Sequence, residues 1–446
     1  MNGPSRIREN GRGAGGFSGG TPRRRTAAVV LAVVGLLVFS AALAAPVRAK
    51  VLVPMDLKQT DHLKAYGLAF WVLQQGQTVE WLLNYRGGSF LMEEDPAIIR
   101  EARIRGVRVD PSTAAQVTEI YTEIETANMD VIMLEKAPRV AIYIPPGFVP
   151  WDDAVTLAFT YAEIPYTAIW DPEVIRGELG KYDWLHLHHE DFTGQYGKFY
   201  AAFRDRPWYR ERVATYEASA RSLGFGKVSD AKRAVVETMR DWVARGGFLF
   251  AMCSATDTFD IALASAGLDI CERMYDGDPA DPSANSRLDF TRTLAFKDFQ
   301  LVTNPMEYEF SNIDMTRVSL QRGERNDYFS LFEFSAKQDP VPTMLTQNHT
   351  SVVKGFLGQT TSFNKPLLKD GVLVMGETEG AQDSRYLHGN FGQGTFTWLG
   401  GHDPEDWQHA VGDPPTNLAL HKNSPGYRLI LNNVLFPAAE KKKQKT

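Results

Sequence analysis

The sequence lacks the basic surface and the phosphate-binding loops that mark nucleic-acid-binding and nucleotide-binding proteins. Of its 446 residues, 48 are Lys or Arg and 54 are Asp or Glu, which gives a formal net charge of −6. A nucleic-acid-binding domain needs a basic face, and after residue 49 the only basic run is the terminal stretch 441–445. No glycine-rich dinucleotide fingerprint and no phosphate loop with its lysine occurs. The sequence therefore argues against nucleic acid as a partner and leaves a small molecule or a glycan.

Cysteine is scarce, because Cys253 and Cys271 are the only two in the chain. If residues 254–266 form a helix, that helix carries the chain about 20 Å away from Cys253. The four residues that follow can bring it back by at most about 13 Å. The Cα atoms of a disulfide lie within about 7 Å of each other. The spacing therefore disfavours a disulfide between the two cysteines.

Residues 1–49 are typical of a targeting segment rather than of a folded domain. A leader rich in Gly and Arg ends at residues 23–25, and no charged residue follows until Arg48. This uncharged stretch and the small residues near its end predict a signal peptide for export to the periplasm or the cell exterior. The competing interpretation is an uncleaved membrane anchor, because about 20 apolar residues can span a bilayer. We favour cleavage, since a strand pattern begins at Lys50 without a linker, so membrane contact is expected only through this segment.

The rest of the chain alternates strand and helix patterns, which predicts an α/β fold. A smaller α/β unit spans residues 50–137 and opens with a strand–helix–strand pattern, in which Asp61 caps the helix. Such a pattern normally builds a parallel sheet. The main domain spans residues 138–437 and contains an inserted, β-rich or irregular region at about 272–370 that can wall a pocket. Residues 438–446 are expected to form a basic, disordered tail.

The stretch 246–259 has the pattern of a nucleophile elbow. An apolar run of strand type ends at Cys253 between small residues, and a helix-type pattern begins at once. A tight strand-to-helix turn of this kind lifts the side chain at its centre above the edge of a sheet. The competing interpretation is that Cys253 is a small buried residue, as free cysteines usually are.

Polar residues follow three strands whose carboxyl ends can meet at one edge of a parallel sheet. They are the loop 188–191, the turn at Cys253 and the segment 402–405. A thiol nucleophile needs a base, and that base needs an acceptor that orients it. Cys253, His402 and Glu405 supply these residue types in that order, so we predict them as nucleophile, base and acid.

The loop after the third strand of the main domain is rich in histidine. We predict that His188, His189 and Glu190 bind substrate, together with Ser254, whose N–H at a helix start would lie near an oxyanion. A second interpretation is a metal site, because His186, His188 and Glu190 alternate and so share one face of a strand. A third is that these histidines are structural and hydrogen-bonded in a buried strand. The predicted site itself contains no metal and no cofactor.

At these residues the sequence resembles the class I glutamine amidotransferase-like superfamily. The resemblance covers roughly residues 139–271 and 372–437. Its motifs are Tyr182–Leu187, the glycine-preceded elbow and Gly392–His402. It implies a flavodoxin-like, doubly wound, mostly parallel sheet with a Cys-His-acid triad, in which Cys253 is the nucleophile and His402 the histidine.

The sequence departs from the family pattern in three places. Ala251 and Ala255 stand where the family's elbow has glycine. Glu405 lies three residues after His402, whereas the family's acid lies two residues after its histidine. The segment 188–190 replaces a glycine pair that helps to form the family's oxyanion hole. Some members, including trehalose-utilisation-type proteins and galactosidase middle domains, are not glutaminases, so the resemblance supports the fold better than the activity.

The whole chain also looks like a group of exported bacterial proteins labelled asparagine synthetase B. A glutaminase of that type uses a cysteine at the mature amino terminus. Its synthetase half needs a Ser-Gly-Gly-x-Asp-Ser pyrophosphate loop. Neither feature occurs in this sequence, so its residues do not support that chemistry.

These patterns support three functional hypotheses of different classes. The first is an exported hydrolase of amide or related carbon–nitrogen bonds that depends on Cys253. The second is a non-catalytic module on the same fold that binds a ligand or glycan or serves in assembly, and the displaced acid and missing glycines favour it. The third is a metal-dependent hydrolase that uses His186, His188 and Glu190.

Overall fold

The computed structural model describes residue 16 and residues 49–147, 153–410 and 412–440. The described residues from 49 to 440 belong to one compact unit. The predicted signal peptide or anchor lies outside the described residues, apart from residues 16 and 49, as do residues 441–446 of the predicted tail. Within the described ranges, no helix combines the length and the apolar character needed to cross a bilayer.

The chain adopts an α/β fold in which strands pair both in parallel and antiparallel. The sheet of the N-terminal unit is entirely antiparallel and has the order β4-β1-β3-β2-β5. Its strands are β1 Lys50–Val53, β2 Val79–Leu83, β3 Ser89–Glu93, β4 Asp110–Ser112 and β5 Asp130–Leu134. The prediction of a parallel sheet here is wrong, because β3 runs straight back from β2 and lies between β2 and β1. Gly87 and Gly88 have φ of 78° and 87°, the left-handed conformation that makes this tight reversal easy.

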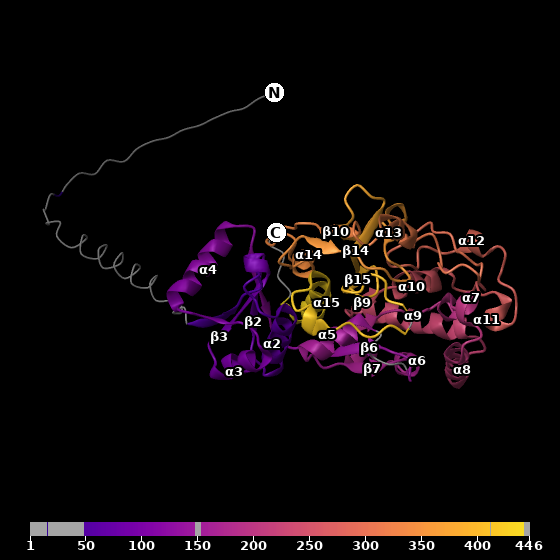
Figure 1. The fold of residues 1–446 in the computed structure, drawn as a ribbon, viewed down its shortest axis with the longest axis horizontal. Coiled ribbons are helices and arrows are strands. Elements are labelled where there is room, and N and C mark those ends of the chain that lie inside the picture. The colour runs from indigo at the N-terminus through magenta and orange to yellow at the C-terminus, as the bar shows by residue number, and fades with distance from the viewer. Residues whose placement is uncertain (1–15, 17–48, 148–152, 411, 441–446) are drawn as a thin grey trace, which may run out of the picture. The chain divides into compact units, whose positions relative to one another are not determined.

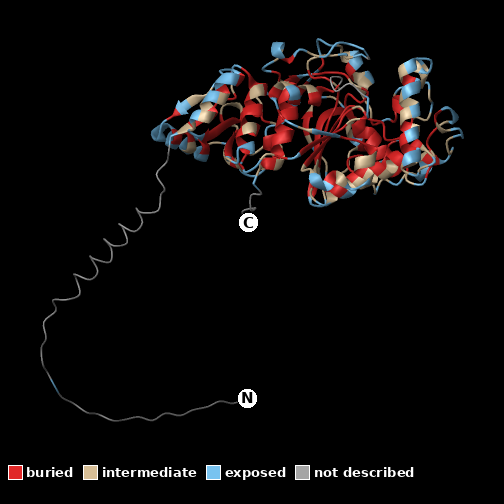
Figure 2. Ribbon diagram, turned by 90° about the horizontal axis from the view of Figure 1, so that it is seen from below, coloured by how far each residue is buried: buried red, intermediate tan, exposed pale blue. Residues whose placement is uncertain are grey.

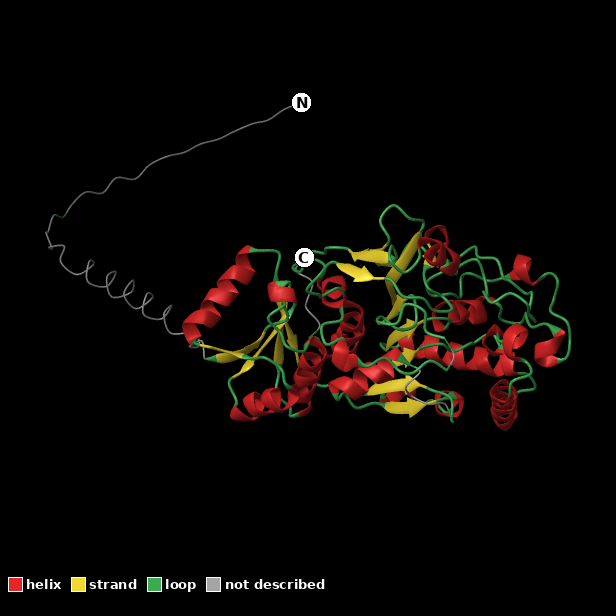
Figure 3. Ribbon diagram, viewed as in Figure 1, coloured by secondary structure: helices red, strands yellow, loops and turns green. Residues whose placement is uncertain are grey.

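Helix α2 (His62–Gln74) begins as predicted, because the carboxylate of Asp61 accepts a hydrogen bond from the N–H of Lys64 at 3.0 Å. Figure 3 shows α2 and α3 (Pro96–Arg105) on one face of the N-terminal sheet and α4 (Ala114–Thr126) on the other. Helix α2 also packs against α5 (Ala154–Ala162) and α15 (Pro425–Leu435). One apolar core therefore continues from the N-terminal unit into the main domain.

The main sheet has ten strands and is mixed rather than mostly parallel. Its parallel part has the order β7-β6-β8-β9-β15. Those strands are β6 Val140–Tyr143, β7 Thr167–Ile169, β8 Trp184–Leu187, β9 Phe248–Met252 and β15 Gly394–Leu399. Beyond β15 the sheet continues antiparallel with β14 Asp383–Phe391, β13 Leu373–Glu377, β10 Tyr328–Leu331 and β11 Val352–Lys354, and β12 Phe363–Asn364 pairs with β14.

Helices cover both faces of the parallel part of the main sheet (Figure 1). Helices α5 and α15 pack in the core that contains Trp184 and Phe250. Helices α9 (Val228–Ala244) and α10 (Ala255–Ala264) pack in the core that contains Leu185 and Leu249. Consecutive side chains along β8, and likewise along β9, therefore pack on opposite faces of the sheet, as the two-residue period of a strand requires. Figure 2 shows buried residues along these strands.

The region 272–370 is largely irregular and contributes β10, β11 and β12 to the main sheet. Its short helices are α11 Arg273–Asp276, α12 Ala284–Arg287, α13 Thr316–Arg322 and α14 Pro340–Leu345. Between β8 and α9 lie α7 (Tyr200–Phe203) and α8 (Pro207–Ser222), which the sequence pattern did not predict. Helix α8 buries only Tyr209, Tyr216, Ser219 and Ala220 of its 16 residues, so its apolar stripe is short.

Candidate functional site

Cys253 occupies a strained turn between β9 and α10. It follows Met252, the last residue of β9, and its φ is 54°, a left-handed value that residues other than glycine seldom adopt. The N–H of Cys253 donates to the carbonyl of Gly401 at 3.2 Å, and the N–H of Ala255 donates to the carbonyl of His188 at 3.0 Å. The predicted elbow is therefore present, and hydrogen bonds join it to the ends of β8 and β15. Such strain persists where surrounding structure enforces it, most often at functional sites.

The thiol of Cys253 is held by backbone N–H groups. Gln359 N donates to Sγ at 3.2 Å. Burial raises the pKa of Cys253 to about 11, although the N–H groups of Gln359, Ser254 and Thr360 favour the thiolate. The side chain is thus a protonated thiol at neutral pH. Ser254 is fully buried at the start of α10, where it was predicted to supply an oxyanion contact.

Both cysteines are free, as the sequence predicts. Cys271 is buried, and its thiol donates to the carbonyl of Thr193 at 3.2 Å. Burial, with the nearby carboxylate of Asp276, raises the pKa of Cys271 well above its usual value. Cys271 therefore provides a matched buried thiol for comparison with Cys253.

A cavity of about 640 Å³ lies against the elbow. Cys253, His189 and His402 line it together, so the three strand ends meet at one site as predicted. One wall comes from the inserted region and consists of Tyr308, Thr316, Leu320, Leu357, Gly358 and Gln359. A second wall is aromatic, with Phe199 and Trp208 at a ring-centroid distance of 5.8 Å.

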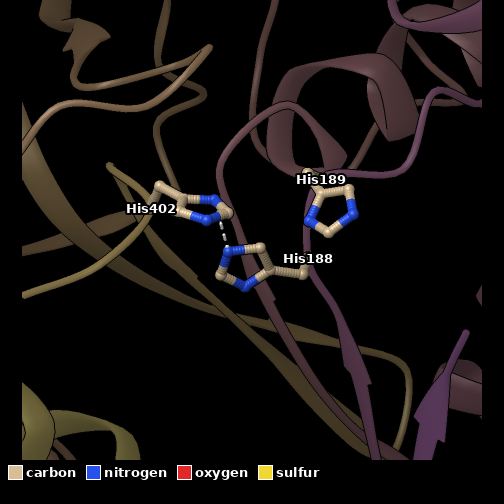
Figure 4. Close-up of side chains that lie close together, drawn as sticks. All are labelled: His188, His189 and His402. Atoms are coloured by element: carbon tan, nitrogen blue, oxygen red, sulfur yellow. Dashed lines mark hydrogen bonds between the residues drawn. The ribbon is translucent and has the colours of Figure 1, made fainter. Parts of the chain in front are cut away.

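A chain of imidazoles leads from the cavity into the core. Nδ1 of His402 lies 2.9 Å from Nε2 of His188 (Figure 4). Nδ1 of His188 lies 3.3 Å from Nε2 of His186, and Nδ1 of His186 lies 3.1 Å from the carbonyl oxygen of Phe250. The carboxylate of Asp153 closes the chain, because Oδ1 lies 3.4 Å from Nδ1 of His188 and 3.5 Å from Nε2 of His186.

Two groups that only accept hydrogen bonds set proton positions along this chain, the carbonyl of Phe250 and the carboxylate of Asp153. A carbonyl oxygen only accepts, so Nδ1 of His186 carries a proton and donates to Phe250. The ring of His186 is buried and stacks on Trp184 and Phe250. An ionised carboxylate also only accepts, so Nδ1 of His188 donates toward Asp153. Burial lowers the pKa of His188, so its Nε2 is an acceptor and Nδ1 of His402 donates to it. With Nδ1 of His402 donating, the nitrogen through which a neutral His402 can take a proton is Nε2.

Asp153, which sequence reasoning missed, anchors the chain. It is buried and caps α5, where Oδ1 accepts from the N–H of Val155 at 2.7 Å. Burial alone would raise the pKa of Asp153, but the imidazoles of His188 and His186 outweigh burial and hold it below its usual value. Burial, reinforced by His402, lowers the pKa of His188 well below its usual value despite the attraction of Asp153. An ionised Asp153 therefore faces a neutral His188.

Glu405, predicted to orient His402, pairs instead with His421. Its carboxylate lies 2.9 Å from Nδ1 of His421. The reason is a local turn in which the N–H of Glu405 donates to the carboxylate of Asp403 at 2.9 Å. The contact on Nδ1 of His402 comes from His188.

Glu190, predicted to bind substrate or metal, belongs to a buried ion-pair cluster. Its Oε1 accepts from Nζ of Lys232 at 3.0 Å and from the hydroxyl of Tyr216 at 2.6 Å. Lys232 is fully buried and also lies 3.1 Å from Asp171. Strand β8 ends at Leu187, so the alternation that placed Glu190 beside the histidines stops before it. Among the described residues, the carboxylate that groups with His186 and His188 is Asp153.

Comparisons with known proteins give no family assignment. No family model matches the chain, and no curated protein matches it. Cytoplasmic protein STM3548 of Salmonella typhimurium is 10% identical over 68% of this chain and 100% of its own, with a TM-score of 0.34. Cytoplasmic protein STM1381 of Salmonella typhimurium LT2 is 11% identical over 60% of this chain and 90% of its own, with a TM-score of 0.29. A catalytic mutant of Gan42B, a GH42 β-galactosidase from G. stearothermophilus, is 12% identical over 60% of this chain and 28% of its own, with a TM-score of 0.26. These scores are too low to support a conclusion about fold or function.

Proposed function

We propose that this protein is an exported hydrolase of amide or related carbon–nitrogen bonds, with Cys253 as nucleophile and His402 as general base. The observation that carries the proposal is the elbow itself: a cysteine held at φ 54° that lines the same 640 Å³ cavity as His402. A strained cysteine at a strand-to-helix turn is the arrangement that presents a nucleophile above a sheet edge. His402, which lines the same cavity, supplies the type of base that a thiol needs.

We also propose that the main domain is flavodoxin-like and related to class I glutamine amidotransferases. If its parallel strands are numbered along the chain, their order across the sheet is 2-1-3-4-5. That is the strand order of doubly wound flavodoxin-like folds, in which ligands bind outside the carboxyl ends of the strands. Cys253, His188 and His402 all follow such ends. The topology thus supports the family that the motifs suggest, although sequence comparison finds no family match.

The reaction begins with proton transfer from the thiol. Nε2 of His402 takes the proton of Cys253 as Sγ attacks the substrate carbonyl, so a stable thiolate is not required beforehand. The proton on Nδ1 of His402 stays in its hydrogen bond to His188, and the charge of the imidazolium is stabilised by the ionised Asp153 behind it. This arrangement replaces the predicted Glu405 with a longer His188–Asp153 connection.

The later steps use the same groups. The N–H groups of Gln359 and Ser254, which lie beside the thiol, stabilise the oxyanion of the tetrahedral intermediate. The carbon–nitrogen bond then breaks, and the imidazolium of His402 gives its proton to the leaving nitrogen. Water attacks the resulting thioester with His402 again acting as base, which releases the acid and restores the thiol of Cys253.

The cavity suggests the size of the substrate. A volume of about 640 Å³ lies in the range that holds small-molecule ligands. The aromatic wall of Phe199 and Trp208 offers flat apolar faces, which stack well on sugar or aromatic rings. We therefore infer a small amide that carries a ring, rather than an extended polypeptide.

A second candidate function is ligand binding without catalysis. The observation that favours it is the raised pKa of Cys253, about 11, because an activated cysteine usually has a lowered pKa. In this case the same cavity binds the ring-containing ligand and Cys253 remains an inert thiol. The two candidates share the pocket and differ only in chemistry.

Hydrolysis assays on two matched variants separate these candidates. Wild type, Cys253→Ser and Cys271→Ala are incubated with a panel of amides, peptides and glycosylamines, and released amine is measured. The hydrolase predicts turnover by wild type and Cys271→Ala, with a loss of at least about 1,000-fold in Cys253→Ser. Equal turnover in Cys253→Ser would contradict the thiol mechanism, and ligand binding without turnover would support the second candidate.

A further inference from the structure

Three histidines gather at the floor of the cavity. Each of His188, His189 and His402 offers one ring nitrogen, and these atoms all lie within 4.8 Å of one another. Figure 4 shows that the rings come from two separate segments, with His402 facing His188 and His189 beside them. His189 and His402 line the cavity, whereas His188 is buried beneath them. The proton transfers of the thiol reaction use only two of these imidazoles, those of His402 and His188.

We propose that His188, His189 and His402 form a binding site for a divalent transition-metal ion of the Zn²⁺ class. Imidazole nitrogens bind Zn²⁺ at about 2.0–2.1 Å, so two ligands of a tetrahedral ion lie about 3.3 Å apart. Nε2 of His188 and Nδ1 of His402 are 2.9 Å apart. Moving these two nitrogens apart by a few tenths of an ångström would make room for the ion. Small rotations of the rings would then bring a nitrogen of His189 within bonding distance of it.

The hydrogen bonds of His188 match those of a metal ligand. A ligand imidazole needs its binding nitrogen unprotonated, and its other nitrogen usually donates to a carboxylate or carbonyl. In His188, Nδ1 donates toward Asp153 and Nε2 is the acceptor that faces His402. The ion takes the place of the proton that Nδ1 of His402 otherwise donates. The buried carboxylate of Asp153 behind His188 also favours a positive charge at this position.

The cavity leaves room for a fourth ligand. Sites with three protein ligands and an open position are typical of Zn²⁺ that binds water or substrate, whereas four protein ligands close the coordination. The open space of about 640 Å³ adjoins two of the three histidines, so the fourth position faces the substrate cavity. The inference does not rest on the thiol reaction, because it requires neither the reactivity nor the presence of the Cys253 side chain. An ion on Nδ1 of His402 leaves the one proton of a neutral ring on Nε2, so the ion-bound protein and the protein in which His402 takes the thiol proton are different states.

Other groups of possible ligands fit an ion less well. The set Asp153, His186 and His188 is wholly buried, and Nδ1 of His186 already bonds the carbonyl of Phe250. In the set Asp269, Cys271 and Asp276, Nζ of Lys227 lies 2.6 Å from Asp269 and 2.9 Å from Asp276. A lysine ammonium occupies the position where an ion would neutralise those carboxylates. The histidine cluster at the cavity floor has no such competing cation among the described residues.

Metal titration of the chelator-stripped protein tests the proposal. Zn²⁺ is titrated calorimetrically, and Co²⁺ is titrated by visible absorption, which reports tetrahedral coordination. We expect one equivalent of each ion and a tetrahedral Co²⁺ spectrum. His189→Ala should weaken binding by at least about tenfold. Asp153→Asn keeps a helix-capping side chain but loses the supporting charge, and should weaken binding by about 10–100-fold.

Two controls keep the result separate from the thiol mechanism. His421→Gln removes a histidine outside the cluster and should leave the affinity unchanged, as should Cys253→Ser. Circular dichroism and thermal melting check that each variant folds. No stoichiometric binding by the folded wild type, or equal affinity in wild type and His189→Ala, would overturn the proposal. An intense thiolate-to-cobalt band that disappears in Cys253→Ser would also overturn it, because Cys253 would then be a ligand of the ion.

Discussion

Nε2 of His188 lies 2.9 Å from Nδ1 of His402, so one imidazole–imidazole hydrogen bond joins the end of β8 to the end of β15. His188 is in turn 3.4 Å from the carboxylate of Asp153, which caps α5. Three elements of the main domain thus fix the orientation of His402 beside the cavity. The proposed reaction and the proposed metal site both depend on this arrangement.

Breaking the bond between the two imidazoles should slow the proposed reaction. His188→Phe keeps a planar ring but cannot accept the proton of His402, so the base loses its orientation and its charge stabilisation. We expect kcat to fall by about 100- to 10,000-fold, the usual contribution of general base catalysis. Steady-state kinetics measure it, with His421→Gln as the control. A kcat within about threefold of wild type would show that His188 does not support the base.

The alkylation rate of Cys253 should rise steeply with pH. Burial raises the pKa of this thiol to about 11, so its thiolate fraction, which reacts with iodoacetamide, grows about tenfold per pH unit below that value. In a Cys271→Ala background, mass spectrometry can follow Cys253 alone between about pH 7 and 10. A rate that is already constant near neutral pH would instead reveal a preformed thiolate.

The strained backbone at Cys253 predicts that a glycine variant is more stable than an alanine variant at this position. Its φ of 54° suits glycine and strains every residue with a Cβ atom. Cys253→Gly and Cys253→Ala both remove the thiol, but the glycine variant should have the larger free energy of unfolding, by about 1 kcal/mol. Urea denaturation compares them. An alanine variant as stable as the glycine variant would mean that the turn relaxes without strain.

The buried cluster around Lys232 should contribute strongly to stability. Lys232 is fully buried and lies 3.0 Å from Glu190 and 3.1 Å from Asp171. Lys232→Met leaves two buried carboxylates without a cation, which should lower the free energy of unfolding by about 3–5 kcal/mol. The triple variant Lys232→Met, Glu190→Gln, Asp171→Asn should recover part of this loss. A single-variant loss below about 1 kcal/mol would show that water or protonation compensates the carboxylates.

Local sequence patterns predicted the elbow and the meeting of strand ends, because both depend on short-range features. The apolar run before Cys253, the small residues around it and the helix pattern after it define the turn, and parallel strands then align their ends. The Asp61 cap of α2 was predictable for the same reason. The antiparallel N-terminal sheet was not, because the placement of β3 between β1 and β2 is a long-range pairing that a strand–helix–strand pattern does not reveal.

The acid of the site was the least predictable part. Glu405 follows His402 in the sequence, but its N–H donates to the side-chain carboxylate of Asp403, and its own carboxylate pairs with His421. Asp153 lies far from His402 in the sequence and carries only the ordinary signal of a helix cap before an apolar run. As the cap of α5, Asp153 lies near His186 and His188. The cap signal in the sequence does not reveal this proximity, which depends on the folded topology.

Trapping the covalent intermediate on Cys253 tests the central claim most directly. Wild-type protein that is turning over an amide substrate is quenched in acid, digested and analysed by mass spectrometry for an acylated cysteine. The proposed mechanism predicts that the acyl group of the substrate is found on the peptide containing Cys253, that it is absent from the Cys271 peptide, and that it disappears in Cys253→Ser together with turnover. Turnover that continues in Cys253→Ser with no acylated cysteine at any time would contradict the account.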